Sequence, residues 1–168
     1  MTSSLKIFSN FINIIPLLIL FFLTFSETAF FFEKYNYLSF NLVHILIFYW
    51  VLKNPEILGY GFIFIAGIIN DVVLGMPIGV SSFTYLILAG FAAYIRYLTV
   101  EPSLIYDWIV FLPSVAVTNS LYYYILKMFF NFDINYINLA AITFATFILY
   151  PFFGYLFSLV LKLIDKGK

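Results

Sequence analysis

Asp71 is a carboxylate in an otherwise apolar part of the chain. It stands beside Asn70 in the stretch GIINDVVLGMPIG, residues 67–79, and hydrophobic runs lie on both sides. An aspartate at the centre of a membrane helix costs about 2.5–3.5 kcal/mol on insertion scales, so such a residue usually has a function. Asp71 could accept a hydrogen bond that fixes the register of a neighbouring helix, pair with a cation, or cap the turn that follows it. The residue types leave these roles open.

The residues around Asp71 predict a groove. Gly67, Asp71 and Gly75 are spaced four apart and therefore share one helix face. Small residues on that face let another backbone come close. The segment 75–79 predicts a tight turn, because glycine supplies positive φ and proline sets the chain direction. We expect a partner-binding or structural groove with the candidate residues His44, Gly67, Asn70, Asp71, Gly75, Pro77 and Gly79.

His44 is the single histidine of the chain. The predicted helices that carry His44 and Asp71 are joined by a short loop, so the two side chains could lie at similar depth and pair. A buried structural histidine is favoured over a proton relay. One histidine and one aspartate make a poor metal site, because no further ligands are supplied. Asn119 stands in the middle of another predicted helix, and we expect it to hydrogen-bond to a neighbouring helix.

Motifs of catalysis are missing from the sequence. It contains no HExxH pair, no phosphate-binding glycine loop, and no plausibly placed Ser/His/Asp set. We therefore expect no enzyme, no cofactor and no metal. Cysteine is absent, which excludes disulfides and thiolate metal sites. The formal net charge of zero gives no reason to expect a nucleic-acid partner.

The composition indicates the medium in which these residues must be positioned. The 168 residues are 64% hydrophobic and 10% charged, with a mean hydropathy of +1.06. Soluble domains average about 45–50% apolar and about 25% charged residues. A soluble core of this size could not hide so much apolar surface, so the chain is predicted to be an all-α integral membrane protein surrounded by lipid.

Polar breaks divide the apolar sequence into six predicted transmembrane helices within a single domain, residues 1–168. The clearest breaks are residues 53–56, which hold two charges and a proline, and the glycine-rich residues 75–79. A bilayer-spanning helix needs roughly 20 apolar residues, and the second segment is short by this measure. The predicted spans are 12–32, 37–52, 57–74, 80–98, 104–130 and 136–164.

Basic residues predict the orientation of the bundle. Short cytoplasmic loops carry an excess of lysine and arginine. With both termini in the cytoplasm, the turn at residues 75–79 faces outward and two lysines, Lys34 and Lys127, lie outside. The remaining six of the eight basic residues are then cytoplasmic, namely Lys6, Lys53, Arg96, Lys162, Lys166 and Lys168.

The order of features over residues 49–95 resembles the MreD family, the rod shape-determining membrane proteins. The family shows an aromatic helix end, a proline loop, a G-F pair, a G-x-x-x-D run and a G-x-P-x-G turn before an apolar helix. Outside this region the resemblance is one of topology. Many members carry an Arg-Pro or similar polar pair before the second helix, where this chain has residues 37–40, YLSF. The matching residues are Tyr49, Trp50, Pro55, Gly61, Phe62, Gly67, Asp71, Gly75, Pro77 and Gly79.

The resemblance implies a non-enzymatic, multi-pass protein of the bacterial inner membrane that belongs to the cell-elongation machinery. Its implied partners are membrane lipid and MreC, a single-span protein with a coiled coil outside the membrane. MreB filaments, the RodA glycosyltransferase and a class B penicillin-binding protein complete the implied assembly. The implied fold is a six-transmembrane-helix bundle similar to the substrate-binding subunits of energy-coupling-factor transporters.

That likeness leaves two hypotheses open. In the first, the chain is a scaffold whose groove at Gly67 and Asp71 accepts a helix or juxtamembrane segment of the partner. In the second, it is the substrate-binding membrane subunit of a small-molecule, vitamin-type uptake transporter. A solute pocket needs several convergent polar groups. Because the predicted outer loops are short and polar residues are few, the sequence favours the scaffold.

Overall fold

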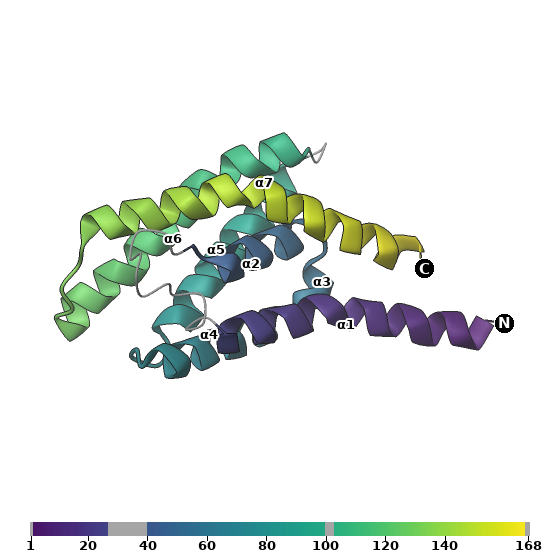
Figure 1. Cartoon of the computed structure of the whole chain (residues 1–168), viewed down its shortest axis with the longest axis horizontal. Coiled ribbons are helices and arrows are strands. Elements are labelled where there is room, and N and C mark those ends of the chain that lie inside the picture. The colour runs from purple at the N-terminus through teal and green to yellow at the C-terminus, as the bar shows by residue number, and fades with distance from the viewer. Residues whose placement is uncertain (1, 27–39, 100–102, 167–168) are drawn as a thin grey trace.

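The computed structural model describes residues 2–26, 40–99 and 103–166, and all regular structure within these ranges is α-helical (Figure 1). Two of the described helices, α6 and α7, are long and apolar enough to cross a membrane by length and composition. The elements in chain order are α1 (Thr2–Ser26), α2 (Leu42–Lys53), α3 (Pro55–Leu58), α4 (Tyr60–Leu74), α5 (Val80–Leu98), α6 (Leu104–Phe130) and α7 (Tyr136–Lys166).

Helix bounds agree closely with the sequence in the second half of the chain. Helices α5 and α6 have the bounds expected for the fourth and fifth segments, and α7 continues to Lys166. Helix α1 begins at Thr2, well before the predicted start of the first segment. Residues 27–32 of the first predicted segment and residues 37–39 of the second lie outside the described residues.

The third predicted segment, 57–74, is not one helix, and that prediction is wrong. A single turn, α3, ends at Gly59, whose φ is +58° and whose N–H donates to the carbonyl of Pro55 at 3.2 Å. Glycine adopts this left-handed conformation without the steric strain of a Cβ. Helix α4 then begins at Tyr60.

Helix α2 is the central element of the fold. It packs against α1, α5 and α7, and every residue from 43 to 52 is buried. Its 12 residues extend about 18 Å, well short of the roughly 30 Å hydrocarbon core of a bilayer. The second segment is therefore a core helix surrounded by protein.

Aromatic side chains fill the core beside α2. Tyr150 of α7 stacks on Phe111 of α6 with ring centroids 4.5 Å apart, and Phe48 of α2 meets Phe111 at 5.0 Å. All three are fully or almost fully buried. Such pairs contribute about 0.5–1.5 kcal/mol beyond the area they bury, so they tie α2, α6 and α7 together.

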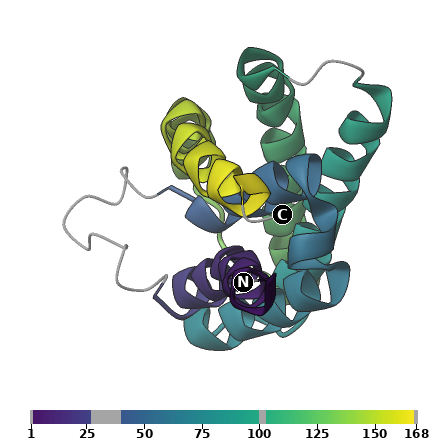
Figure 2. The same cartoon turned by 90° about the vertical axis from the view of Figure 1, so that its right-hand side faces the viewer.

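The bundle has two distinct ends. The start of α1 and the end of α7 lie at one end, which we call the terminal end, and they face the viewer in Figure 2. The α4–α5 turn and the α6–α7 connection lie at the opposite end, which we call the turn end (Figure 1).

Candidate functional site

Asp71 caps the N-terminus of α5. Its Oδ2 accepts a hydrogen bond from the N–H of Gly79 at 2.7 Å, and its Oδ1 accepts from the N–H of Ser81 at 3.0 Å. The first N–H groups of a helix have no partner within it, and the helix dipole places partial positive charge there. The fully buried carboxylate therefore satisfies two backbone donors at the positive end of α5.

The backbone of Asp71 also helps to close α4. The N–H of Met76 donates to the carbonyl of Asp71 at 2.8 Å, and the N–H of Gly75 donates to that of Val72 at 3.3 Å. This pair of bonds, with Gly75 at φ +65°, is a Schellman motif. Gly79 has a φ of +102°, so both turn glycines hold conformations that L side chains rarely adopt.

Gly67 brings α4 and α5 into close contact. A Cβ at Gly67 would lie 2.5 Å from the backbone nitrogen of Ser82 and would overlap the Cα of that residue. The Ser82 hydroxyl donates to the carbonyl of Phe64 at 2.9 Å across the same contact. The close approach expected at Gly67 is thus made by α5 of the same chain, which fills the groove expected there for a partner helix.

His44 and Asp71 are not paired. The imidazole of His44 instead packs edge-to-face on Tyr85 of α5, with ring centroids 5.3 Å apart. His44 is 6% exposed, and its Nδ1 has no hydrogen-bond partner among the described residues.

Asn70 points to the same region. Its Nδ2 donates to the hydroxyl of Ser81 at 3.2 Å, whereas its Oδ1 is buried with no partner in the described part of the chain. Asn70 is 3% exposed. Buried polar atoms are nearly always paired, and these two exceptions lie on α2 and α4.

These two side chains line a cavity of about 280 Å³ at the turn end, which we call the turn-end cavity. Helices α2, α4, α5, α6 and α7 all contribute to its wall. Among the seven predicted site residues, the structure brings His44 and Asn70 to this cavity and uses Asp71, Gly75, Pro77 and Gly79 in the adjacent turn. The lining residues are Asn41, His44, Asn70, Leu74, Met76, Ser81, Thr84, Tyr85, Asn119, Tyr122, Tyr123, Leu126, Phe132, Asp133, Ile134 and Ile142.

Asn119 confirms the expected interhelical hydrogen bond and also lines the cavity. Its Nδ2 donates to the hydroxyl of Thr143 on α7 at 2.9 Å. The tyrosines and apolar residues that complete the wall could not be predicted from the sequence, because they come from segments far apart in the chain. Within the described ranges, no three histidine, aspartate or glutamate side chains gather where they could hold a metal ion.

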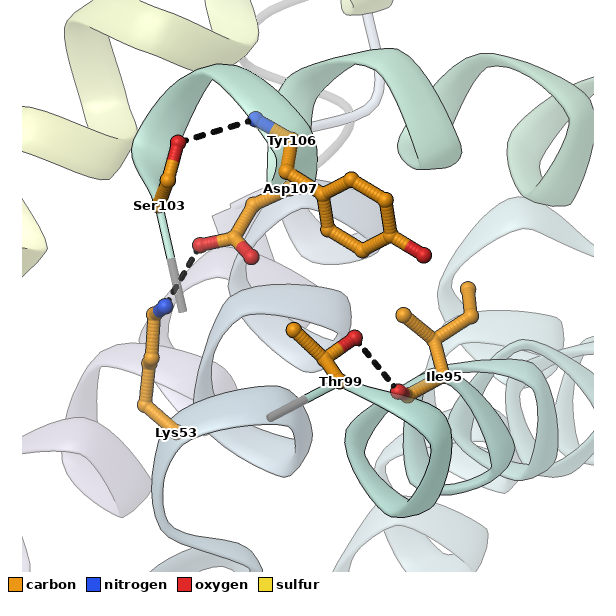
Figure 3. A network of polar contacts seen from close by, with 6 residues as sticks. All are labelled: Lys53, Ile95, Thr99, Ser103, Tyr106 and Asp107. Carbon is orange, nitrogen blue, oxygen red and sulfur yellow. Dashed lines mark hydrogen bonds and ion pairs between the residues drawn. The ribbon is translucent and has the colours of Figure 1, made fainter. Parts of the chain in front are cut away.

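An ion pair that sequence reasoning missed joins α2 to α6 (Figure 3). Lys53 reaches Asp107 in the first turn of α6, and the aspartate side chain is 1% exposed. The hydroxyl of Ser103 caps the same helix by accepting from the N–H of Tyr106 at 3.3 Å. About 18 Å of helix separates Asp107 from Asn119, the first α6 residue of the cavity wall, so the pair is a separate, structural feature.

Comparison with protein-family models, with curated proteins and with solved structures found no match for this chain.

Proposed function

We propose that this chain is a non-enzymatic, MreD-type component of the bacterial cell-elongation complex, which binds a single-span, MreC-like partner. Through that partner it would link MreB filaments to RodA and a class B penicillin-binding protein. The observation that carries the proposal is the order of features over residues 49–95. In support, the structure brings these residues into one unit. The missing side chain of Gly67 lets α5 pack closely on α4, and the Asp71 carboxylate accepts backbone hydrogen bonds at the end of the turn from Gly75 to Gly79.

We also propose that the chain is a six-span bundle of the bacterial inner membrane with both termini in the cytoplasm. The length and apolar composition of α6 and α7 support membrane insertion. The distribution of charge supports the orientation, since Lys53, Arg96 and Lys162 lie toward the terminal end and Lys127 toward the turn end. The short helix α2 would lie within the bundle, shielded from lipid by its neighbours.

The partner would dock at the turn end. Ile78, at the tip of the α4–α5 turn, is 72% exposed and offers an apolar side chain beyond the helices. In the proposed orientation this tip faces outward, where the extracytoplasmic part of a single-span partner leaves the membrane. The face of α4 at Gly67 is occupied by α5, so the turn itself is the more accessible contact.

Co-purification with the single-span coiled-coil protein of the same bacterium tests this function. We expect Ile78→Glu to reduce recovery of the partner while the amount of folded chain in the membrane stays normal. Tyr97→Glu is a matched control, because Tyr97 is 88% exposed near the opposite end of α5. Failure of the unaltered chain to recover the partner would overturn the proposal, and equal loss in both variants would remove Ile78 from the interface.

The turn-end cavity favours a second candidate, the substrate-binding membrane subunit of a small-molecule uptake transporter. Its wall brings together polar side chains from several helices, among them His44, Asn70 and Asn119. Recovery of a pair of ATP-binding cassette proteins with the chain, in place of the single-span partner, would favour this candidate over the scaffold.

A further inference from the structure

We propose that the Lys53–Asp107 ion pair is a releasable latch, in which Tyr150 of α7 becomes the partner of the Asp107 carboxylate when Lys53 leaves it. With the latch closed, as in this structure, Asp107 ties α6 to α2. With the latch open, Asp107 ties α6 to α7, and Lys53 extends to the surface of the terminal end. This device is independent of the scaffold function and of the turn-end cavity.

The unequal burial of the two charged side chains is the first part of the argument. Asp107 is 1% exposed, whereas Lys53, the last residue of α2, keeps 14% of its side-chain surface exposed. A lysine carries its ammonium group on a long, flexible stem, so Lys53 can reach water without a movement of α2. The short, buried side chain of Asp107 has no such route, so an open latch leaves its carboxylate inside the protein.

The energetics of buried ion pairs allow the latch to open. Removal of two charges from water costs about as much free energy as their attraction returns, so a buried pair often adds little net stability. Within the described residues, Lys53 is the one cation paired with Asp107. The open state therefore requires another partner for the carboxylate, because a buried charge without one is unfavourable.

Tyr150 has the unused donor that the open state requires. Its side chain is 1% exposed, and its hydroxyl is buried with no hydrogen-bond partner in the described part of the chain. A buried hydroxyl without a partner destabilises the closed state, and a hydrogen bond to a carboxylate removes that cost in the open state. The same bond is strengthened by the charge of its acceptor.

The packing of α6 against α7 brings this hydroxyl into the neighbourhood of Asp107. Tyr150 stacks on Phe111 with ring centroids 4.5 Å apart, and Phe111 lies one helical turn after Asp107 on the same face of α6. The charge of Asp107 acts electrostatically on the Tyr150 hydroxyl, although no hydrogen bond joins the two groups in the closed state. Tyr150 is thus a nearby donor that the carboxylate does not yet use.

Thermal unfolding of four chains in detergent tests the latch: the unaltered chain, Tyr150→Phe, Lys53→Met and the double variant. In the unaltered background the hydroxyl is unpaired, so Tyr150→Phe should leave the unfolding temperature unchanged or raise it. In the Lys53→Met background the carboxylate depends on Tyr150, so the same change should lower the unfolding temperature. Tyr94→Phe, on an exposed face of α5, is the matched control and should have the same effect in both backgrounds.

Two results of this comparison would overturn the proposal. A loss of stability that is as large in the unaltered background would show that the Tyr150 hydroxyl is already paired, for example with a buried water. No loss in the Lys53→Met background would show that the hydroxyl does not reach Asp107.

Amine labelling of the full chain in lipid nanodiscs tests the opening with Lys53 in place, so it does not depend on the folding of Lys53→Met. Tyr150→Phe removes the partner that stabilises the open state, so labelling of Lys53, followed by peptide mass spectrometry, should slow about tenfold. Lys162, which is exposed on α7, is the internal control and should be labelled at the same rate in both chains. Equal labelling of Lys53 in the unaltered and Tyr150→Phe chains would overturn the proposal.

Discussion

The carboxylate of Asp71 accepts hydrogen bonds from the backbone of Gly79 at 2.7 Å and of Ser81 at 3.0 Å, so the end of α4 caps the start of α5. This relationship explains why an acidic residue is retained in so apolar a stretch. Near the C-terminus of its own helix the negative charge is unfavourable, but the partial positive charge at the start of α5 and two backbone donors offset that cost.

Replacement of Asp71 should destabilise the fold in a graded way. Asparagine keeps one acceptor oxygen and is nearly as good a cap, so we expect Asp71→Asn to cost about 1 kcal/mol. Leucine strands two buried N–H groups, so Asp71→Leu should cost about 2–4 kcal/mol. Thermal unfolding of the purified chain in detergent gives the order of stabilities. Equal stability of Asp71→Leu and the unaltered chain would show that the cap contributes nothing.

Gly67→Ala should separate α4 from α5. The added Cβ meets backbone atoms of Ser82, which cannot rotate away, and overpacking of this kind costs about 1–3 kcal/mol. Gly90→Ala is the matched control, because a Cβ there meets nothing within 4 Å and alanine favours a helix over glycine by about 1 kcal/mol. We expect a lower unfolding temperature for Gly67→Ala and an unchanged or higher one for Gly90→Ala. The reverse order would contradict the packing described here.

The Lys53–Asp107 ion pair should show strong coupling between its members. Lys53→Met leaves the buried carboxylate of Asp107 without a cation, and loss of one partner from a buried pair costs about 3–5 kcal/mol. Replacement of both residues, Lys53→Met with Asp107→Leu, should cost much less than the sum of the single changes. A double-mutant cycle on unfolding in detergent measures this coupling. Additive costs would mean that the two side chains do not interact.

His44→Phe should not destabilise the fold. Phenylalanine keeps the edge-to-face contact with Tyr85 and removes the unpartnered Nδ1, so we expect unchanged stability or a gain of about 1 kcal/mol. Thermal unfolding of the isolated chain is the measurement, and a clear loss of stability would show that His44 has a structural role instead.

Several features of the fold follow from local sequence signals. The glycines and proline of residues 75–79 predict the turn, and the bounds of α5 and α6 follow from the polar breaks that surround them. Asn119 was predicted to bond across helices because an amide in apolar surroundings needs a partner, and Thr143 is that partner. These signals depend on short stretches of chain or on one residue's need for a hydrogen bond.

Other features depend on how distant segments pack and could not be predicted. The break at Gly59 is hidden in an apolar run, where one glycine is compatible with a continuous helix. Lys53 and Asp107 come from separate helices, so their pairing requires the tertiary fold. The turn-end cavity is formed by five helices, and its orphan atoms are visible only once every other contact is assigned.

Depletion of this chain from the cells that encode it, with cell width followed by microscopy, is the direct test of the proposed function in cell elongation. We predict that cells widen and round up as the chain is lost. The unaltered chain should restore their width, while Ile78→Glu at the same membrane level should not. Unchanged cell width after complete depletion would contradict a function in cell elongation.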